Sequence, residues 1–247
     1  AVLGIVLPLS ASALTFDANV TPGVIFGSGN TNGSFTVDSG NGVELGLRGK
    51  LRHNASGSPE NTFNSNGDGT YSFDAGVAPT QSAPTAVWSF EWSINSDWDN
   101  STGAALDDYT YALMLDFDPT QGTSFGSIFD PINTPYADHS LGTNADDDST
   151  DIVSADALDY AFDISILNVA QNSWKAHWFL GPGFDPTADA TYDIALAAYD
   201  GGAEIAKTSI QIVVGAGGAA VPDEGSSAVL MGIALVGFMA LRRRNQA

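Results

Sequence analysis

The chain has 247 residues and a formal net charge of −21, because it contains 29 acidic residues and only 8 basic ones. This charge repels nucleic acid and anionic lipid headgroups at long range, so we expect no nucleic-acid partner. The absence of cysteine excludes disulfides and thiolate metal sites. Hydrophobic residues make up 43% of the chain, which is typical of a folded domain rather than of a disordered chain.

The N-terminal residues 1–13 are expected to be the remainder of a secretory signal peptide. The first nine residues are apolar, and Ala11-Ser12-Ala13 has the small-x-small pattern that signal peptidase cleaves. A buried strand is the alternative, but Pro8 disfavours it. We therefore expect export, with the folded domain beginning at residue 14.

Residues 14–214 are expected to form one antiparallel β-sandwich with a jelly-roll-like arrangement of about eight to ten strands. Short segments of alternating hydrophobic and polar residues are separated by turns rich in Gly, Asn and Asp. In residues 88–95 the large apolar side chains share one face and polar side chains the other, which predicts a half-buried strand. Further strands are predicted within 34–52 around an Asn41-Gly42 turn, and at 110–118, 172–180, 191–199 and 204–214.

One helix is expected within residues 151–169. Ser154 is a candidate N-cap, and Leu158, Phe162 and Ile166 recur every four residues, which is typical of the apolar face of a helix. The run at 164–167 is also compatible with a strand, so the C-terminal limit of this helix stays open.

Two groups of aspartates are candidate ligands for Ca²⁺, which prefers oxygen ligands. Asp116 and Asp118 lie on the same face at the end of a predicted strand, and the alternative for them is a solvated strand end that turns at Pro119. The second group lies in one short loop, for which a solvated acidic surface is the alternative. It consists of Asp146, Asp147, Asp148 and Asp151.

Trp98 is the candidate aromatic side chain for stacking on a sugar, because it lies in a polar segment. Asp97 and Asp99 would supply hydrogen bonds to the same ligand. The alternative is that Trp98 packs against the edge of a sheet. Trp174 and Trp178, predicted on one face of the strand at 172–180, are further candidates.

No motif in the chain predicts catalysis. The three histidines, His53, His139 and His177, match no metalloprotease spacing, and no nucleophile elbow is present. Glu91 has no second acid beside it on its strand, whereas a retaining glycosidase needs two carboxylates about 5 Å apart. The sequence therefore predicts no enzymatic activity.

The C-terminal residues 221–247 have three parts, which follow a Gly/Ala linker at 215–220. Val221, Pro222, Asp223 and Gly225 come first, and an apolar run at 228–241 follows. Arg242, Arg243 and Arg244 end the series. A run of this length spans ~21 Å as a helix. Acidic residues before it and arginines after it predict a single transmembrane helix with the arginines in the cytoplasm.

This order of parts resembles the PEP-CTERM class of sorting signals, and most closely its VPDSG-CTERM form, where this chain has VPDEG. The resemblance implies that an exosortase recognises the motif and removes the tail. It also implies export to the cell envelope, the cell surface or the extracellular matrix, often in association with exopolysaccharide. The body, as in "AVWSFEWSIN", "DFDP" and "NVAQNSW", is similar to uncharacterised β-sandwich members of this class.

Two functions are therefore expected from the sequence. The first is an exported structural or adhesive protein of the cell surface or matrix. The alternative is a lectin-like module that binds exopolysaccharide, with Ca²⁺ as its possible cofactor. Neither function requires a catalytic residue.

Overall fold

The computed structural model describes residues 13–147 and 150–219. The predicted signal segment lies outside this part of the chain except for Ala13. The sorting motif, the transmembrane helix and the arginine cluster predicted at 221–247 also lie outside the described residues. Within the described residues, no helix has the length and apolar character needed to cross a membrane.

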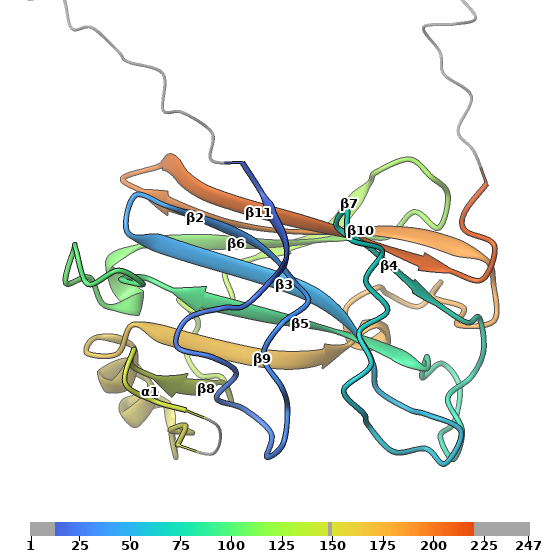
Figure 1. Ribbon diagram of the computed structural model, residues 1–247, viewed down its shortest axis with the longest axis horizontal. Helices are drawn as coiled ribbons and strands as arrows, with labels where there is room; N and C mark the ends of the chain where they lie inside the picture. Colours follow the sequence, from blue (N-terminus) through green and yellow to red (C-terminus); the bar gives the residue numbers. More distant parts are fainter. Residues whose placement is uncertain (1–12, 148–149, 220–247) are drawn as a thin grey trace, which may run out of the picture.

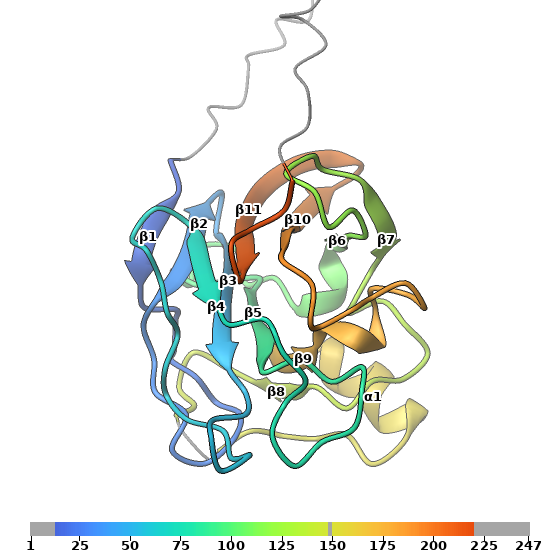
Figure 2. The ribbon, with the colours of Figure 1, turned by 90° about the vertical axis from the view of Figure 1, so that its right-hand side faces the viewer.

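The described chain folds as a sandwich of two β-sheets, which confirms the predicted all-β class. Figures 1 and 2 show the sheets packed face to face. The six-stranded sheet has the order β1 (Thr15–Ala18), β2 (Phe35–Gly40), β3 (Val43–Leu51), β5 (Trp88–Asn95), β9 (Val169–Lys175) and β8 (Ser140–Gly142). The five-stranded sheet has the order β4 (Thr70–Phe73), β11 (Ala203–Val214), β10 (Ala190–Asp200), β6 (Thr110–Asp116) and β7 (Phe125–Phe129).

The strands predicted on either side of Asn41-Gly42 pair as a hairpin, and so do those predicted at 191–199 and 204–214. Asn41 and Gly42 join β2 to β3 and both have positive φ, as a two-residue type I′ turn requires. A Cβ at position 42 would also collide with the side chain of Thr102. The β10–β11 hairpin has Ile194 opposite Ile210. One pairing departs from the predicted antiparallel pattern, because β4 runs parallel to β11 at the edge of its sheet.

The core lies between the sheets and is centred on the apolar face of β5. The side chains of Trp88, Phe90, Trp92 and Ile94 are all buried there. Trp174 of β9 packs edge-on against Trp92, with 5.3 Å between ring centroids. Truncating one of these large side chains to alanine is expected to cost about 3–5 kcal/mol of stability.

The prediction that β5 is half-buried is wrong, because its polar face is buried as well. The segment 19–33, between β1 and β2, covers this outer face of the six-stranded sheet. Polar side chains of the sheet hold its backbone: Gln171 accepts from the Ile25 amide at 2.9 Å, and Asn95 donates to the Thr21 carbonyl at 2.9 Å. The alternating pattern of β5 therefore reflects one apolar face and one polar face, both of which are buried.

The predicted helix is shorter than expected, and the face that it buries is not the one with Leu158, Phe162 and Ile166. Helix α1 spans Ala157–Ile164, and Asp156 caps it by accepting from the Leu158 and Asp159 amides. The side chains of Leu158, Phe162 and Ile166 are 82%, 62% and 56% exposed. Tyr160 and Ile164 are buried instead, and the Tyr160 hydroxyl donates to the Ile132 carbonyl at 2.8 Å.

The predicted N-cap of this helix and the strand predicted at 172–180 also differ in detail. Ser154 does not cap α1, because its hydroxyl donates to the Asp163 carboxylate at 2.7 Å. Strand β9 ends at Lys175, and a 3-10 helix follows at Ala176–Trp178. This turn of helix separates the two tryptophans: Trp174 is buried in the core, whereas Trp178 is 56% exposed.

Candidate functional site

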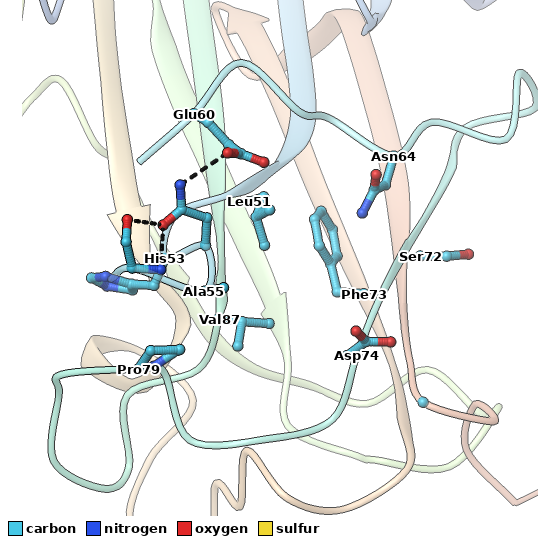
Figure 3. Close-up of a pocket in the computed structure, with 13 residues that line it drawn as sticks. Leu51, His53, Ala55, Glu60, Asn64, Ser72, Phe73, Asp74, Pro79 and Val87 are labelled. Carbon is cyan, nitrogen blue, oxygen red and sulfur yellow. Dashed lines mark hydrogen bonds between the residues drawn. The ribbon is translucent and has the colours of Figure 1, made fainter. Parts of the chain in front are cut away.

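A cleft of about 790 Å³ lies beside the C-terminal ends of β3 and β4. Its floor is apolar and is made by side chains that include Leu51, Phe73 and Val87, as Figure 3 shows. Its rim is polar and comes mainly from the two long loops around β4. The polar lining side chains are His53, Asn54, Ser56, Glu60, Asn64, Ser72 and Asp74.

Main-chain hydrogen bonds fix the loop between β3 and β4, which forms one wall of the cleft. The Leu51 amide donates to the Thr62 carbonyl at 2.8 Å, and the Ser72 amide donates to the Asn64 carbonyl at 3.1 Å. Gly57 adopts a φ of +82°, and a Cβ there would lie 2.9 Å from the Pro79 carbonyl oxygen. Glycine at position 57 therefore lets the two loops approach each other.

The polar side chains of this wall hold one another in place. Asn54 donates to the Glu60 carboxylate at 2.9 Å, and its own oxygen accepts from the Ser56 amide and hydroxyl. On the other side, Asn64 and Asp74 have exposed side chains with no hydrogen-bond partner among the described residues. Figure 3 shows both turned toward the cleft. These two side chains are thus available to a ligand.

Gly215, the first residue of the predicted linker 215–220, also lines the cleft. Its amide donates to the Phe73 carbonyl at 2.9 Å. Farther along, the Gly218 amide donates to the Thr191 hydroxyl at 2.8 Å. The described part of the linker is therefore packed against the sandwich, and it brings the chain to the edge of the cleft.

Asp116 is the last residue of β6, and Asp118 lies in the loop that follows it. Asp116 is fully buried, and its carboxylate accepts from the backbone amides of Asp118 and Ser124 at 2.9 and 2.8 Å. Asp118 accepts from the Thr120 amide at 2.9 Å. Within residues 13–147 and 150–219, no group of three or more His, Asp or Glu side chains is arranged to hold a metal. The two carboxylates therefore hold the backbone of the loop after β6, and Asp116 is buried rather than solvated as the alternative expected.

The second aspartate group is described only in part, because Asp148 lies outside the described residues. Asp146 accepts from the amide and hydroxyl of Thr143, and Asp151 accepts from the Ser140 hydroxyl. Calcium binding by this loop stays a prediction.

Trp98 and its acidic neighbours lie far from the cleft. The Trp98 amide donates to Gly42 at the start of β3, whereas the cleft lies at the end of that strand, ~30 Å away along it. The Trp98 indole N–H is buried without a hydrogen-bond partner among the described residues. Asp97 accepts from the amide and hydroxyl of Thr102, and Asp99 accepts from the Ser101 amide. These carboxylates hold their own loop together.

Glu91 is placed for a structural role. It is fully buried on the outer face of β5, and the Arg48 guanidinium donates to it at 2.7 Å. The Arg48 guanidinium in turn lies between the rings of Phe35 and Phe63, 4.1 and 3.8 Å from their centroids. A carboxylate held in this way is not accessible to a polysaccharide, so the geometry does not favour a hydrolase that uses Glu91.

Sequence reasoning missed the cleft residues themselves. Asn54, Glu60, Asn64 and Asp74 lie in loops whose Asn, Ser, Gly and Pro content predicts only turns. The sequence signal that could have indicated the cleft is the length of the two loops around the short strand β4. Long loops in compact domains are often functional.

The comparison with known protein families finds a match at the C-terminal end of the chain. The VPDSG-CTERM motif matches residues 220–244. The chain carries a VPDSG-CTERM sorting motif. This motif indicates an exported, cell-surface-directed protein that is processed by exosortase. No curated protein and no solved structure matches the chain, so the expected similarity of the body to other β-sandwich members has no support from known proteins.

Proposed function

We propose that this exported protein is an adhesive component of the cell surface that binds a polysaccharide in the cleft between β3 and β4. The observation that carries the proposal is the pairing of an apolar floor with a rim of amides, hydroxyls and carboxylates. A sugar ring has the matching chemistry, because its C–H faces are apolar and its edges carry hydroxyls that donate and accept hydrogen bonds.

The size of the cleft and the location of the protein support this assignment. About 790 Å³ is within the range of small-molecule sites, roughly 300–1,000 Å³. The VPDSG-CTERM motif directs the protein to the cell surface, where polysaccharide is abundant. We propose binding without turnover, because the histidine of the cleft, His53, is buried. The side chains left for a ligand are those of Asn64 and Asp74 at the rim.

The test is binding of the purified chain to an array of neutral and acidic glycans. Asn64→Gly, which suits the positive φ of this position, and Asp74→Ala should each weaken binding by about tenfold or more while leaving the melting temperature unchanged. Asp99→Ala is the matched control at the opposite end of β3, and it should bind as the wild type does.

Two results would contradict the proposal. If Asp99→Ala or Trp98→Ala abolished binding while the cleft variants did not, the binding site would be the one predicted from the sequence. If no glycan bound and the protein associated with itself, a structural role would replace carbohydrate binding.

A further inference from the structure

Four of the five basic residues in the described chain gather at one end of the six-stranded sheet. Arg48, Lys50 and Arg52 alternate along β3 and its C-terminal end, so they point to the same outer face. Across the sheet, Lys50 lies beside Ser89, and Ser89 lies beside Lys175 of β9. We call Lys50, Arg52 and Lys175 the basic corner. In a chain of net charge −21, this is a local reversal of sign.

The buried part of this region has more positive than negative charge. Arg48 and Lys50 share one carboxylate, that of Glu91, at 2.7 Å from the Arg48 Nε and 3.3 Å from the Lys50 Nζ. Asn30 adds a neutral acceptor to both. All four side chains are buried. One positive charge is therefore left without a carboxylate, which is costly in a protein interior unless an anion compensates for it.

The other two cations of the corner have no acidic partner at all. Neither Arg52 nor Lys175 makes a side-chain hydrogen bond or ion pair with any described residue, although both are half-buried. Lys175 lies 5.7 Å from the ring centroid of Trp178, whose side chain is exposed. Such an aromatic ring beside a cation suits a charged sugar, because the ring contacts the sugar face while the cation contacts its acidic group.

A hollow of about 160 Å³ opens at this corner and adjoins the cleft. Lys50, Arg52 and Glu91 line it, and Glu60 lines both the hollow and the cleft. Arg52 faces the hollow, whereas the next residue, His53, lines the cleft. The carboxylates that line the hollow are those of Glu91 and Glu60, and the cations that line it are Lys50 and Arg52. Arg48 and Lys175 add two further positive charges to this end of the sheet.

Two nearby histidines, His53 and His177, lie within the electrostatic influence of these positive charges. Burial lowers the pKa of His177, and Lys175 and His53 lower it further. Burial is also the first cause that lowers the pKa of His53, to which Lys175 and Arg52 add. The acidic remainder of the protein acts less at this point, because charges more than about 8 Å away are largely screened at physiological ionic strength.

We propose that the basic corner binds the anionic group of an acidic polysaccharide, a carboxylate or a sulfate, whose sugar chain lies in the adjoining cleft. This inference rests on the proposed function and adds to it the class of polysaccharide. Arg52 and Lys175 contact the anionic group, and Lys50 supplies the uncompensated charge behind them.

The experiment compares polygalacturonate with its methyl ester, which keeps the sugar chain and removes the charge. Affinities of the purified chain are measured by titration calorimetry for the wild type, Arg52→Gln/Lys175→Gln and Lys207→Gln. Lys207 is an exposed lysine on β11 and is the matched control. The wild type should bind the acid form about tenfold or more tightly than the ester. The double variant should bind both forms alike, and Lys207→Gln should behave as the wild type.

The outcomes separate this inference from the proposed function. Equal affinity of the wild type for acid and ester, or full preference for the acid in the double variant, would overturn the basic corner and leave the cleft proposal standing. Absence of binding to both forms and to every neutral glycan would overturn both. Displacement of polygalacturonate by inorganic phosphate at similar concentration would also overturn it, since the site would then be a general anion site. An unchanged melting temperature of the double variant shows that its fold is intact.

Discussion

Glu44 shows at the scale of one residue how the sheet holds the segment that covers it. Its carboxylate is buried on β3 and accepts from the Thr21 amide at 2.6 Å. Burial raises the pKa of Glu44 to about 7, and this effect exceeds the lowering of the pKa by the hydrogen bonds from Thr21. The folded state therefore binds this proton more tightly than the unfolded chain does.

The pH dependence of stability follows from that difference. With the folded pKa raised from 4.5 to about 7, the contribution is fully present below pH 4.5 and is lost as the pH rises through 7. Urea unfolding of the wild type between pH 4.5 and 8 should show a loss of roughly 1–3 kcal/mol that Glu44→Gln does not show. Glu204→Gln, at an exposed carboxylate, is the control. Parallel pH profiles for wild type and Glu44→Gln would contradict this account.

A second residue-scale prediction concerns calcium at Asp146, Asp147 and Asp151, with Asp148 outside the described residues. If this loop binds Ca²⁺ in the folded state only, the ion raises the melting temperature, because a native-state ligand stabilises by RT ln(1 + [L]/Kd). Melting in millimolar CaCl₂ should then exceed melting in NaCl of equal ionic strength, and Asp147→Asn should reduce the difference. Identical melting temperatures with Ca²⁺ and with EDTA would show that this loop does not bind calcium.

At the scale of the element, α1 shows that periodicity alone does not choose the buried face of a short helix. Two stripes with a spacing of four residues run along it, one with Leu158 and Phe162 and the other with Tyr160 and Ile164. The second stripe faces the core, because the Tyr160 hydroxyl finds a buried carbonyl acceptor there. The more hydrophobic stripe is left in solvent.

Substitutions on the two stripes should therefore differ sharply in cost. Leu158→Ser and Phe162→Ser, at exposed positions, should change the free energy of unfolding by no more than about 0.5 kcal/mol. Ile164→Ala and Tyr160→Ala should each cost about 2–5 kcal/mol, through a cavity and, for tyrosine, an unpaired carbonyl. Chemical denaturation of the four variants measures this. Larger losses at Leu158 and Phe162 than at Tyr160 and Ile164 would mean that α1 packs with the face predicted from the sequence, and similar losses would contradict the burial of one stripe alone.

At the scale of the whole molecule, one sandwich serves two purposes at opposite faces of its six-stranded sheet. The inner face packs the aromatic core, and the outer face carries the buried polar network under segment 19–33. The loops at one end of this sheet form the cleft and the basic corner. The VPDSG-CTERM motif directs this body to the cell surface, where a ligand of the kind proposed is encountered.

The features that the sequence alone determined are those set by neighbouring residues. An Asn-Gly pair favours the positive φ angles of a hairpin turn, which Asn41 and Gly42 adopt, and strict alternation in residues 88–95 predicts a strand. The sorting motif is likewise a continuous stretch of residues, so it can be recognised in the sequence without knowledge of the fold. Export and the all-β class follow from such local signals.

The tertiary structure alone decided which polar residues are buried and which are available. Alternation shows that Glu91 and Trp92 face opposite ways, but only the packing of segment 19–33 shows that Glu91 is enclosed. The cleft joins residues as distant as Leu51 and Gly215, and the basic corner joins Lys50 to Lys175 across β5. Contacts between residues so far apart depend on the register of strands and the paths of loops, which no local pattern specifies.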